Sequence, residues 1–210
     1  MKVARIEALA DGIFAIAMTL LVLDLHVPTI LSELNLQLIH LLLNFLALTI
    51  SFIILGIYWV GHHFLLARLK LVDLRFTWWN IVFLLSFSIV PFTTFLLGKY
   101  PLITIAQIIY ALNLACCGIL LFCCVSQALV QSTFFENKPT VEFKRNIATK
   151  VLLPSFVYIL SALASLASPY LGMMFLVVAP LISFVPIESK SWQFLLKPTD
   201  WAYHILTFGK

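Results

Sequence analysis

The sequence predicts an all-α membrane protein with six transmembrane helices. Of its 210 residues, 62% are hydrophobic and only 10% are charged, whereas soluble domains are about 25% charged. The mean hydropathy is +1.07. Such a chain has too few polar side chains to cover a surface that faces water. No segment alternates between apolar and polar residues over the ten-residue spans that a membrane β-barrel needs.

Six apolar runs are long enough to cross a bilayer core, which takes about 20 residues in a helix. Turn-forming residues such as Pro28 and Pro139 separate them. The second run is long enough to tilt or to project from the membrane. The polar stretch 131–146 is expected to be a loop. The predicted spans are 6–26, 38–66, 75–97, 102–130, 147–167 and 169–187.

The placement of basic residues predicts the orientation of the chain. With these spans, all of the 13 Lys and Arg except Lys99 fall on one side of the membrane. Cytoplasmic segments carry the excess of basic residues, so both termini are expected in the cytoplasm. Residues 1–190 then form the six-helix transmembrane domain. Residues 191–210 form an amphipathic tail that is expected to lie at the membrane surface, against lipid.

Several other functions find little support in the composition. The four cysteines share one apolar run and cannot link distant segments, so they are expected to pack as small apolar residues. The net charge of +4 is spread among loops and does not favour nucleic acid. Five histidines with one adjacent pair do not supply the clusters of a membrane metalloenzyme or a bis-histidine haem site. Neither a metal, a cofactor nor an enzyme activity is expected. The cysteines are Cys116, Cys117, Cys123 and Cys124.

Charged residues in the first span need an explanation, because a charge deep in a bilayer costs roughly 2.5–3.5 kcal/mol. Arg5 and Glu7 lie near one interface and can extend their charged ends into water. Asp24 lies near the other interface. Asp11 lies about one and a half turns inside, so its carboxylate needs a partner from the protein.

On a helical wheel of about 100° per residue, the first span carries one narrow apolar stripe. Thr19 lies at the edge of this stripe, and Asp11 points away from it. Taken alone, such a stripe usually faces lipid or a protein core. Its members are Leu9, Gly12, Ile16, Leu20 and Leu23.

The second span contains the most prominent candidate partners for Asp11, in the segment YWVGHHF. Trp59 is three residues before His62 and four before His63, so each pair shares a helix face. Asn80, early in the third span, lies at a similar depth. A network of Asp11, Trp59, a histidine and Asn80 would satisfy the carboxylate. Unrelated packing of these side chains remains the alternative.

These residues resemble a known family. The stretch RIEALADGIFAIAMTLLVLDL is similar to the first helix of the transmembrane protein 175 family of potassium channels. Its members carry Arg, three residues, Phe-Ser-Asp and then an apolar run. Arg5 and Asp11 match this pattern, whereas Leu9 and Ala10 replace Phe and Ser. The segment YWVGHHF and Asn80 resemble the family's Trp-and-His signature and its downstream Asn.

The resemblance implies a bacterial, single-repeat, homotetrameric channel of the inner cell membrane that conducts monovalent cations and modestly prefers K⁺ over Na⁺. The first helix of each subunit would line a central pore, with Ile16, Leu20 and Leu23 as hydrophobic constrictions that act as filter and gate. Thr19, beside the Ile16 ring, would help to coordinate a partly dehydrated ion. The structural polar network would comprise Arg5, Asp11, Trp59, His62, His63 and Asn80.

Two other functions stay open. A proton- or ion-coupled secondary transporter could use Asp11 and the histidines as a proton relay. Pro154 and Pro180 could kink the last two spans, but the paired broken helices and internal repeats typical of transporters are missing from the sequence. A non-conducting membrane scaffold would carry no ion flux.

Overall fold

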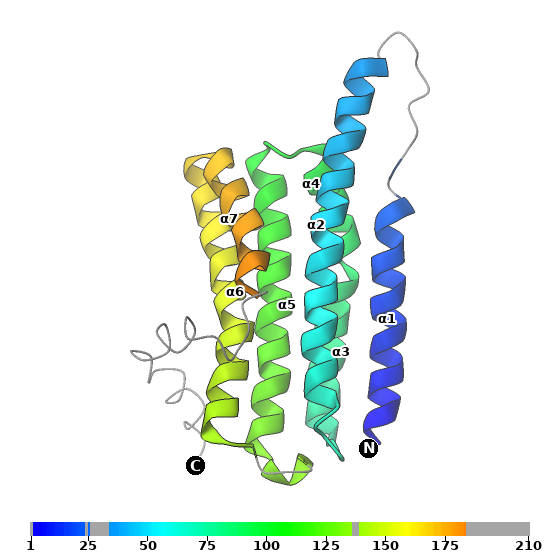
Figure 1. Cartoon of the computed structure of the whole chain (residues 1–210), viewed down its shortest axis with the longest axis vertical. Helices are drawn as coiled ribbons and strands as arrows, with labels where there is room; N and C mark the ends of the chain where they lie inside the picture. Colours follow the sequence, from blue (N-terminus) through cyan, green and yellow to red (C-terminus); the bar gives the residue numbers. More distant parts are fainter. Residues whose placement is uncertain (1, 24, 26–33, 136–138, 184–210) are drawn as a thin grey trace.

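Long helices, packed side by side, form the bundle seen in the computed structural model (Figure 1). The structure describes residues 2–23, 25, 34–135 and 139–183. Within them there is no β-strand, only an isolated bridge between Leu69 and Phe135. In chain order the helices are α1 (Val3–Leu23), α2 (Leu34–Leu66), α3 (Leu74–Ser88), α4 (Val90–Lys99), α5 (Thr104–Val130), the 3₁₀ helix η2 (Ser132–Phe134), α6 (Val141–Ala167) and α7 (Pro169–Ser183).

The described chain contains five helical stretches that are long and apolar enough to cross a membrane, one of them formed by α3 and α4 together. The remaining helix, α7, is apolar but has only 15 residues. The prediction of an all-α, multi-pass membrane protein is confirmed. Helix α2 has 33 residues and extends beyond its neighbours at one end of the bundle (Figure 1), as its length predicts.

The predicted third span, 75–97, is broken into two helices. Helix α3 ends at Ser88 and α4 begins at Val90, with Ile89 between them. Pro91 follows at once. It has no N–H to donate to the carbonyl four residues earlier, and its ring crowds that carbonyl. The predicted span is therefore present, with a break at Ile89 that hydropathy did not indicate.

The predicted loop 131–146 was wrong in its second half. Helix α6 begins at Val141, six residues earlier than the span predicted from hydropathy. The Thr140 side chain accepts a hydrogen bond from the backbone N–H of Phe143 and so caps the helix. A polar first turn is compatible with a helix whose start projects towards water.

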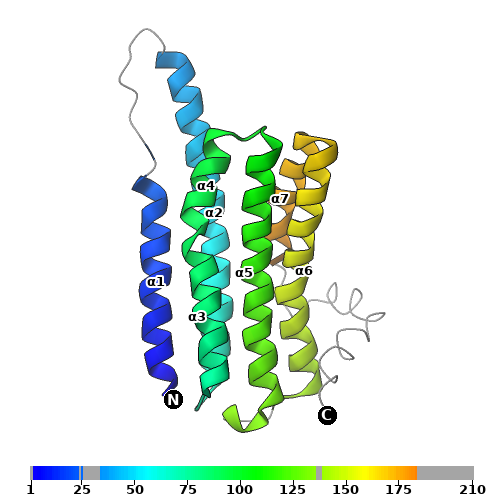
Figure 2. The ribbon, with the colours of Figure 1, turned by 180° about the vertical axis from the view of Figure 1, so that it is seen from behind.

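Helix α5 lies in the middle of the bundle. Seen from behind, α3 and α4 lie on one side of it and α6 on the other (Figure 2). Two glycines permit close approach of the helices here. A Cβ at Gly118 of α5 would overlap Ser155 of α6, and one at Gly172 of α7 would overlap Ser165 of α6.

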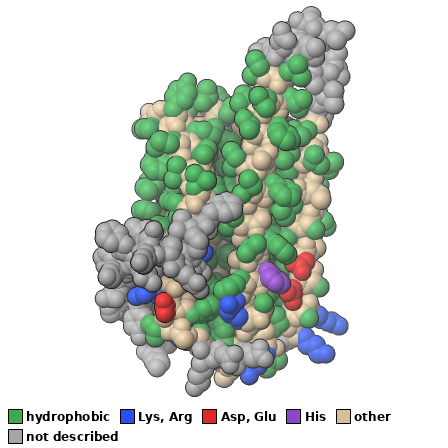
Figure 3. All heavy atoms as spheres, viewed as in Figure 1, with side chains coloured by type: hydrophobic (Ala, Val, Ile, Leu, Met, Phe, Trp, Pro, Cys, Tyr) green, Lys and Arg blue, Asp and Glu red, His purple; other side chains and the backbone are tan. Residues whose placement is uncertain are grey.

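The two ends of the bundle differ in their content of charged side chains. On the face drawn in Figure 3, the charged side chains gather near the end where α1 begins, and the upper part is mostly hydrophobic. Of the basic residues that the structure describes, only Lys99 belongs to the other end. The asymmetry that the sequence predicts is therefore present. Placement of this end in the cytoplasm stays a prediction.

Three other sequence predictions fall outside the described residues. These are the tail at 191–210, the end of the sixth span beyond Ser183, and Asp24 near the outer interface. The boundary at residue 190 and the amphipathic character of the tail therefore stay predictions.

Candidate functional site: the first helix and its seam with the second

Helix α1 buries one face against the rest of the subunit. Its buried side chains recur every three or four residues, the spacing of a single helix face. This face packs against α2, α3 and α4. The buried residues are Ile6, Ala10, Phe14, Ala17 and Leu21.

Phe14 anchors the centre of this face. Its side chain is 1% exposed. The centroid of its ring lies 4.2 Å from that of Phe87, 5.6 Å from that of His62 and 6.1 Å from that of Phe83. Tilted aromatic pairs at such distances are favourable beyond the area they bury. One side chain of α1 thus joins it to both α2 and α3.

The predicted apolar stripe lies on the opposite, uncovered side of α1. Ile16 is 60% exposed, Leu20 40% and Leu23 68%. Leu9 is also exposed, and nothing lies within 4 Å of where a Cβ would stand on Gly12. In a single subunit, therefore, no other helix of the described chain covers this stripe.

Thr19 lies among these exposed residues, and its hydroxyl group is bound to its own helix. The Oγ1 atom lies 3.0 Å from the Ala15 carbonyl and 2.9 Å from the Ile16 carbonyl, to which it donates. Because the hydroxyl hydrogen is turned towards the helix, the oxygen lone pairs are left to accept from, or to coordinate, a group outside it.

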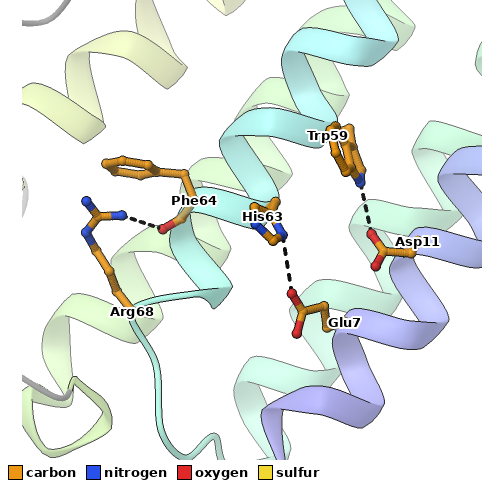
Figure 4. A network of polar contacts seen from close by, with 6 residues as sticks. All are labelled: Glu7, Asp11, Trp59, His63, Phe64 and Arg68. Carbon is orange, nitrogen blue, oxygen red and sulfur yellow. Dashed lines mark hydrogen bonds and ion pairs between the residues drawn. The ribbon is translucent and has the colours of Figure 1, made fainter.

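A polar seam joins α1 and α2 at the surface (Figure 4). Trp59 donates its indole N–H to Oδ1 of Asp11 over 2.9 Å, and Nδ1 of His63 lies 3.2 Å from Oε1 of Glu7. The Trp59 and His63 rings are stacked, with centroids 5.8 Å apart. Two acidic residues one turn apart on α1 therefore face two aromatic residues one turn apart on α2.

The other histidine points inwards. His62 is buried, and its Nε2 accepts a hydrogen bond of 2.6 Å from the amide nitrogen of Asn80. Its ring stacks on that of Phe83. The structure thus places the polar residues in two groups, an exposed one with Asp11 and Trp59 and a buried one with His62 and Asn80. Arg5 is exposed on the first turns of α1.

Sequence reasoning missed two features of this site, the pairing of Glu7 with His63 and the anchoring role of Phe14. A signal for the first was present, because Glu7 and Asp11 are four apart, as are Trp59 and His63. In antiparallel helices, such pairs meet as two successive contacts. Among the described residues, no group of three or more His, Cys, Asp or Glu comes together as a metal site would need.

The fold and this site define a class, a multi-pass helical membrane protein in which one helix presents an uncovered apolar stripe. The family model for the endosomal/lysosomal potassium channel TMEM175 matches residues 5–91, the part that contains most of α1, the seam and Asn80. A structural relative covers more of the chain. The crystal structure of a lysosomal potassium-selective channel TMEM175 homolog from Chamaesiphon minutus matches with a TM-score of 0.77 and 26% identity, over 89% of this chain and 98% of that one.

Similar sequences come from three bacteria and are named as potassium channels. The one from Chamaesiphon minutus is 38% identical over 52% of this chain and 58% of its own length. The one from Chryseobacterium is 41% identical over 47% of this chain and 50% of its own length. The one from Streptomyces collinus is 37% identical over 46% of this chain and 48% of its own length. The matches thus span about half the length of these relatives. Together with the family model over residues 5–91 and the shared fold, they show that this chain is similar to TMEM175 potassium channels.

Proposed function

We propose that the chain is one subunit of a potassium-selective channel, in which copies of α1 surround a central pathway. The observation that carries this proposal is the uncovered stripe of Ile16, Leu20 and Leu23. The three similar bacterial proteins are named as potassium channels rather than as enzymes. A helix stripe that is apolar and uncovered in the subunit suits a lining that several copies share.

The apolar side chains define how selectivity would arise. Rings of Ile16 and Leu20 offer no carbonyl oxygens to replace the water around an ion, unlike the filters of many potassium channels. K⁺ would be preferred because it loses its hydration water more cheaply than Na⁺ in a narrow apolar neck. Selectivity of this origin is modest. Closure by a small rotation of α1 would empty the neck of water and stop conduction.

Thr19 would add a polar element to this neck. Because its hydroxyl hydrogen is donated to the Ala15 and Ile16 carbonyls, its lone pairs face away from the helix. In a homotetramer, the Thr19 residues of all the subunits would form a ring beside the Ile16 ring. Such a ring suits a partly dehydrated cation better than an apolar surface does.

The test is K⁺ flux into liposomes that contain the purified protein, driven by a K⁺ gradient and read with a proton-sensitive dye. Ile16→Asn should raise flux and lower the K⁺ over Na⁺ preference, because an amide weakens the apolar barrier. Val22→Asn is the matched control. Val22 is also exposed on α1 but lies off the stripe, so this variant should conduct as the wild type does.

Three outcomes would contradict the proposal. Equal effects of the two substitutions would show that position on the stripe is irrelevant. Flux that saturates and depends on a counter-ion would indicate a coupled transporter instead. No flux from a folded oligomer, in the wild type and in Ile16→Asn, would indicate a scaffold.

A further inference from the structure

A cavity of about 310 Å³ opens between α2 and α6, away from α1. Its lining is largely apolar and comes from α2, α5, α6 and α7. The size is at the lower end of the range of about 300–1,000 Å³ for small-molecule sites. The cavity belongs neither to the polar seam nor to the stripe on α1.

One cation lines this apolar space. Lys150 of α6 is partly buried, and its ammonium group makes no hydrogen bond or ion pair with another described side chain. The hydroxyl of Tyr58, which also lines the cavity, donates instead to the Leu114 carbonyl at 2.7 Å. A lysine within an apolar membrane segment is costly unless an anion or water meets it.

Lys150 lies at the end of the cavity that faces the basic end of the bundle. The α6 residues farther along the lining, Pro154 and Tyr158, lie one and two turns beyond it. The cavity therefore runs about 12 Å along α6, with the cation at one end and apolar groups beyond it. A molecule with an anionic head and an apolar chain would match this cavity, because its head would meet the cation and its chain would meet the apolar groups.

A second cation lies farther along the contact between α2 and α6. The Arg68 guanidinium carbon is 3.4 Å from the centroid of the Phe64 ring and 5.3 Å from that of Phe143. Phe143 is two helical turns before Lys150, on the same face of α6. One Arg68 nitrogen donates to the Phe64 carbonyl, and a guanidinium has five N–H donors in all.

We propose that this cavity binds an anionic phospholipid, with part of an acyl chain between α2 and α6 and the headgroup between Lys150 and Arg68. Along the axis, about 10 Å separate Lys150 from the turn of Phe143. The flexible four-carbon stem of lysine shortens this gap by extending towards the interface. Basic pockets between transmembrane helices bind anionic headgroups in this manner. Charge complementarity therefore favours phosphatidylglycerol over the zwitterionic phosphatidylcholine.

The experiment measures lipid bound to the full-length protein in mild detergent, by native mass spectrometry, with phosphatidylglycerol or phosphatidylcholine added at equal concentration. The wild type should prefer phosphatidylglycerol. Lys150→Met should weaken its binding about fivefold, the contribution expected of one basic residue. Lys144→Met is the matched control, because Lys144 is on the same helix and at the same end but does not line the cavity. It should keep the preference.

A second pair of variants tests the acyl-chain part without changing charge. A Cβ on Gly61 would meet Leu121 at an ordinary 3.9 Å, so Gly61→Ala should fold and bind lipid normally. Gly61→Leu should fill the cavity and lower retention of phosphatidylglycerol. Equal retention in all four variants would overturn the proposal. So would loss of the preference together with a changed oligomeric state, because the cavity would then be a contact between copies. Neither readout depends on ion flux.

Discussion

Helix α1 and the α5–α6–α7 group are attached to the subunit in contrasting ways. The helices of the α5–α6–α7 group approach each other closely at two glycines, and buried hydroxyls of α6 bind across the contacts. Ser161 donates to the Gly172 carbonyl, and Ser165 donates to Oε1 of Gln107. Helix α1 has one large aromatic anchor, Phe14, and a seam of exposed polar contacts.

The difference indicates which part of the molecule is able to move. Backbone-level packing with bound hydroxyls leaves little freedom for α6 to shift against α7, because any displacement breaks buried hydrogen bonds. Among the described residues, the polar contacts of α1 with another helix are those of the seam, and these lie at the surface. Small rotations of α1 are therefore cheaper than movements of α6. This agrees with the proposed gating by the first helix.

The largest expected effect is that of Phe14→Ala. Removal of a buried aromatic side chain costs about 3–5 kcal/mol, and here the loss falls on the docking of α1. Hydrogen exchange should become faster in α1, while the amides of α5, α6 and α7 stay protected. Phe156→Ala is the matched control, because Phe156 is exposed on α6 and its loss should change little. Uniform loss of protection would mean that α1 and α6 unfold as one unit, against the comparison.

The second largest effect is expected from Gly172→Ala, which changes the packing within the α5–α6–α7 group. A new Cβ would overlap Ser165 Oγ and lie 2.6 Å from Gln107 Oε1, so the helices must separate. Overpacking costs about 1–3 kcal/mol, which should lower the melting temperature of the detergent-solubilised protein. Gly12→Ala is the matched control and should leave stability unchanged or raise it by up to about 1 kcal/mol, because a helical Gly is unfavourable and the site is open. A stable Gly172→Ala variant would show that α6 and α7 are loosely packed.

The features of this molecule that could be predicted from its sequence are those set by local residue patterns. Hydropathy and the 100° helical period depend on neighbouring residues, so they predict the spans and the stripe with Ile16. They do not decide which proline breaks a helix. Pro91 stands at a break, whereas Pro154 and Pro180 lie inside continuous helices, and only the surrounding packing distinguishes these cases.

The rotation of α2 was the decisive unknown at the candidate site. His62 and His63 are adjacent and point about 100° apart on the helix, so the two side chains cannot share one environment. The sequence did not indicate which of the two histidines faces inwards, and the predicted network therefore included both of them with Asp11. Once Phe14 and Phe83 enclose His62, His63 is left at the surface opposite Glu7. Contacts between helices, not periodicity, separate the buried pair from the exposed seam.

The smallest expected effect concerns the polar seam between α1 and α2, and it measures how firmly the seam contacts hold α1. The hydrogen bond from Trp59 to the Asp11 carboxylate is charge-assisted, and such bonds contribute about 1.5–3 kcal/mol when buried. At this exposed position, a double-mutant cycle of Asp11→Ala and Trp59→Phe should give a coupling below this range, about 1 kcal/mol, in the free energy of unfolding. Asp11→Ala should disturb folding or assembly more than unitary conductance, because Asp11 lies off the stripe.

The second contact of the seam supplies the control for this cycle. Glu7 and His63 are about one-third and one-half exposed, at 34% and 50%, so their coupling should be at most about 1 kcal/mol and, when His63 is protonated, should fall as salt is added. A Glu7→Gln and His63→Gln cycle should therefore give the smaller coupling of the two. If both cycles give equal, salt-insensitive values, the seam holds α1 as firmly as buried hydroxyls hold α6. Rotation of α1 would then cost as much as movement of α6, and gating by the first helix would need another explanation. If the Asp11 cycle shows no coupling but Asp11→Ala alters ion affinity, the carboxylate belongs to the permeation path rather than to the attachment of α1.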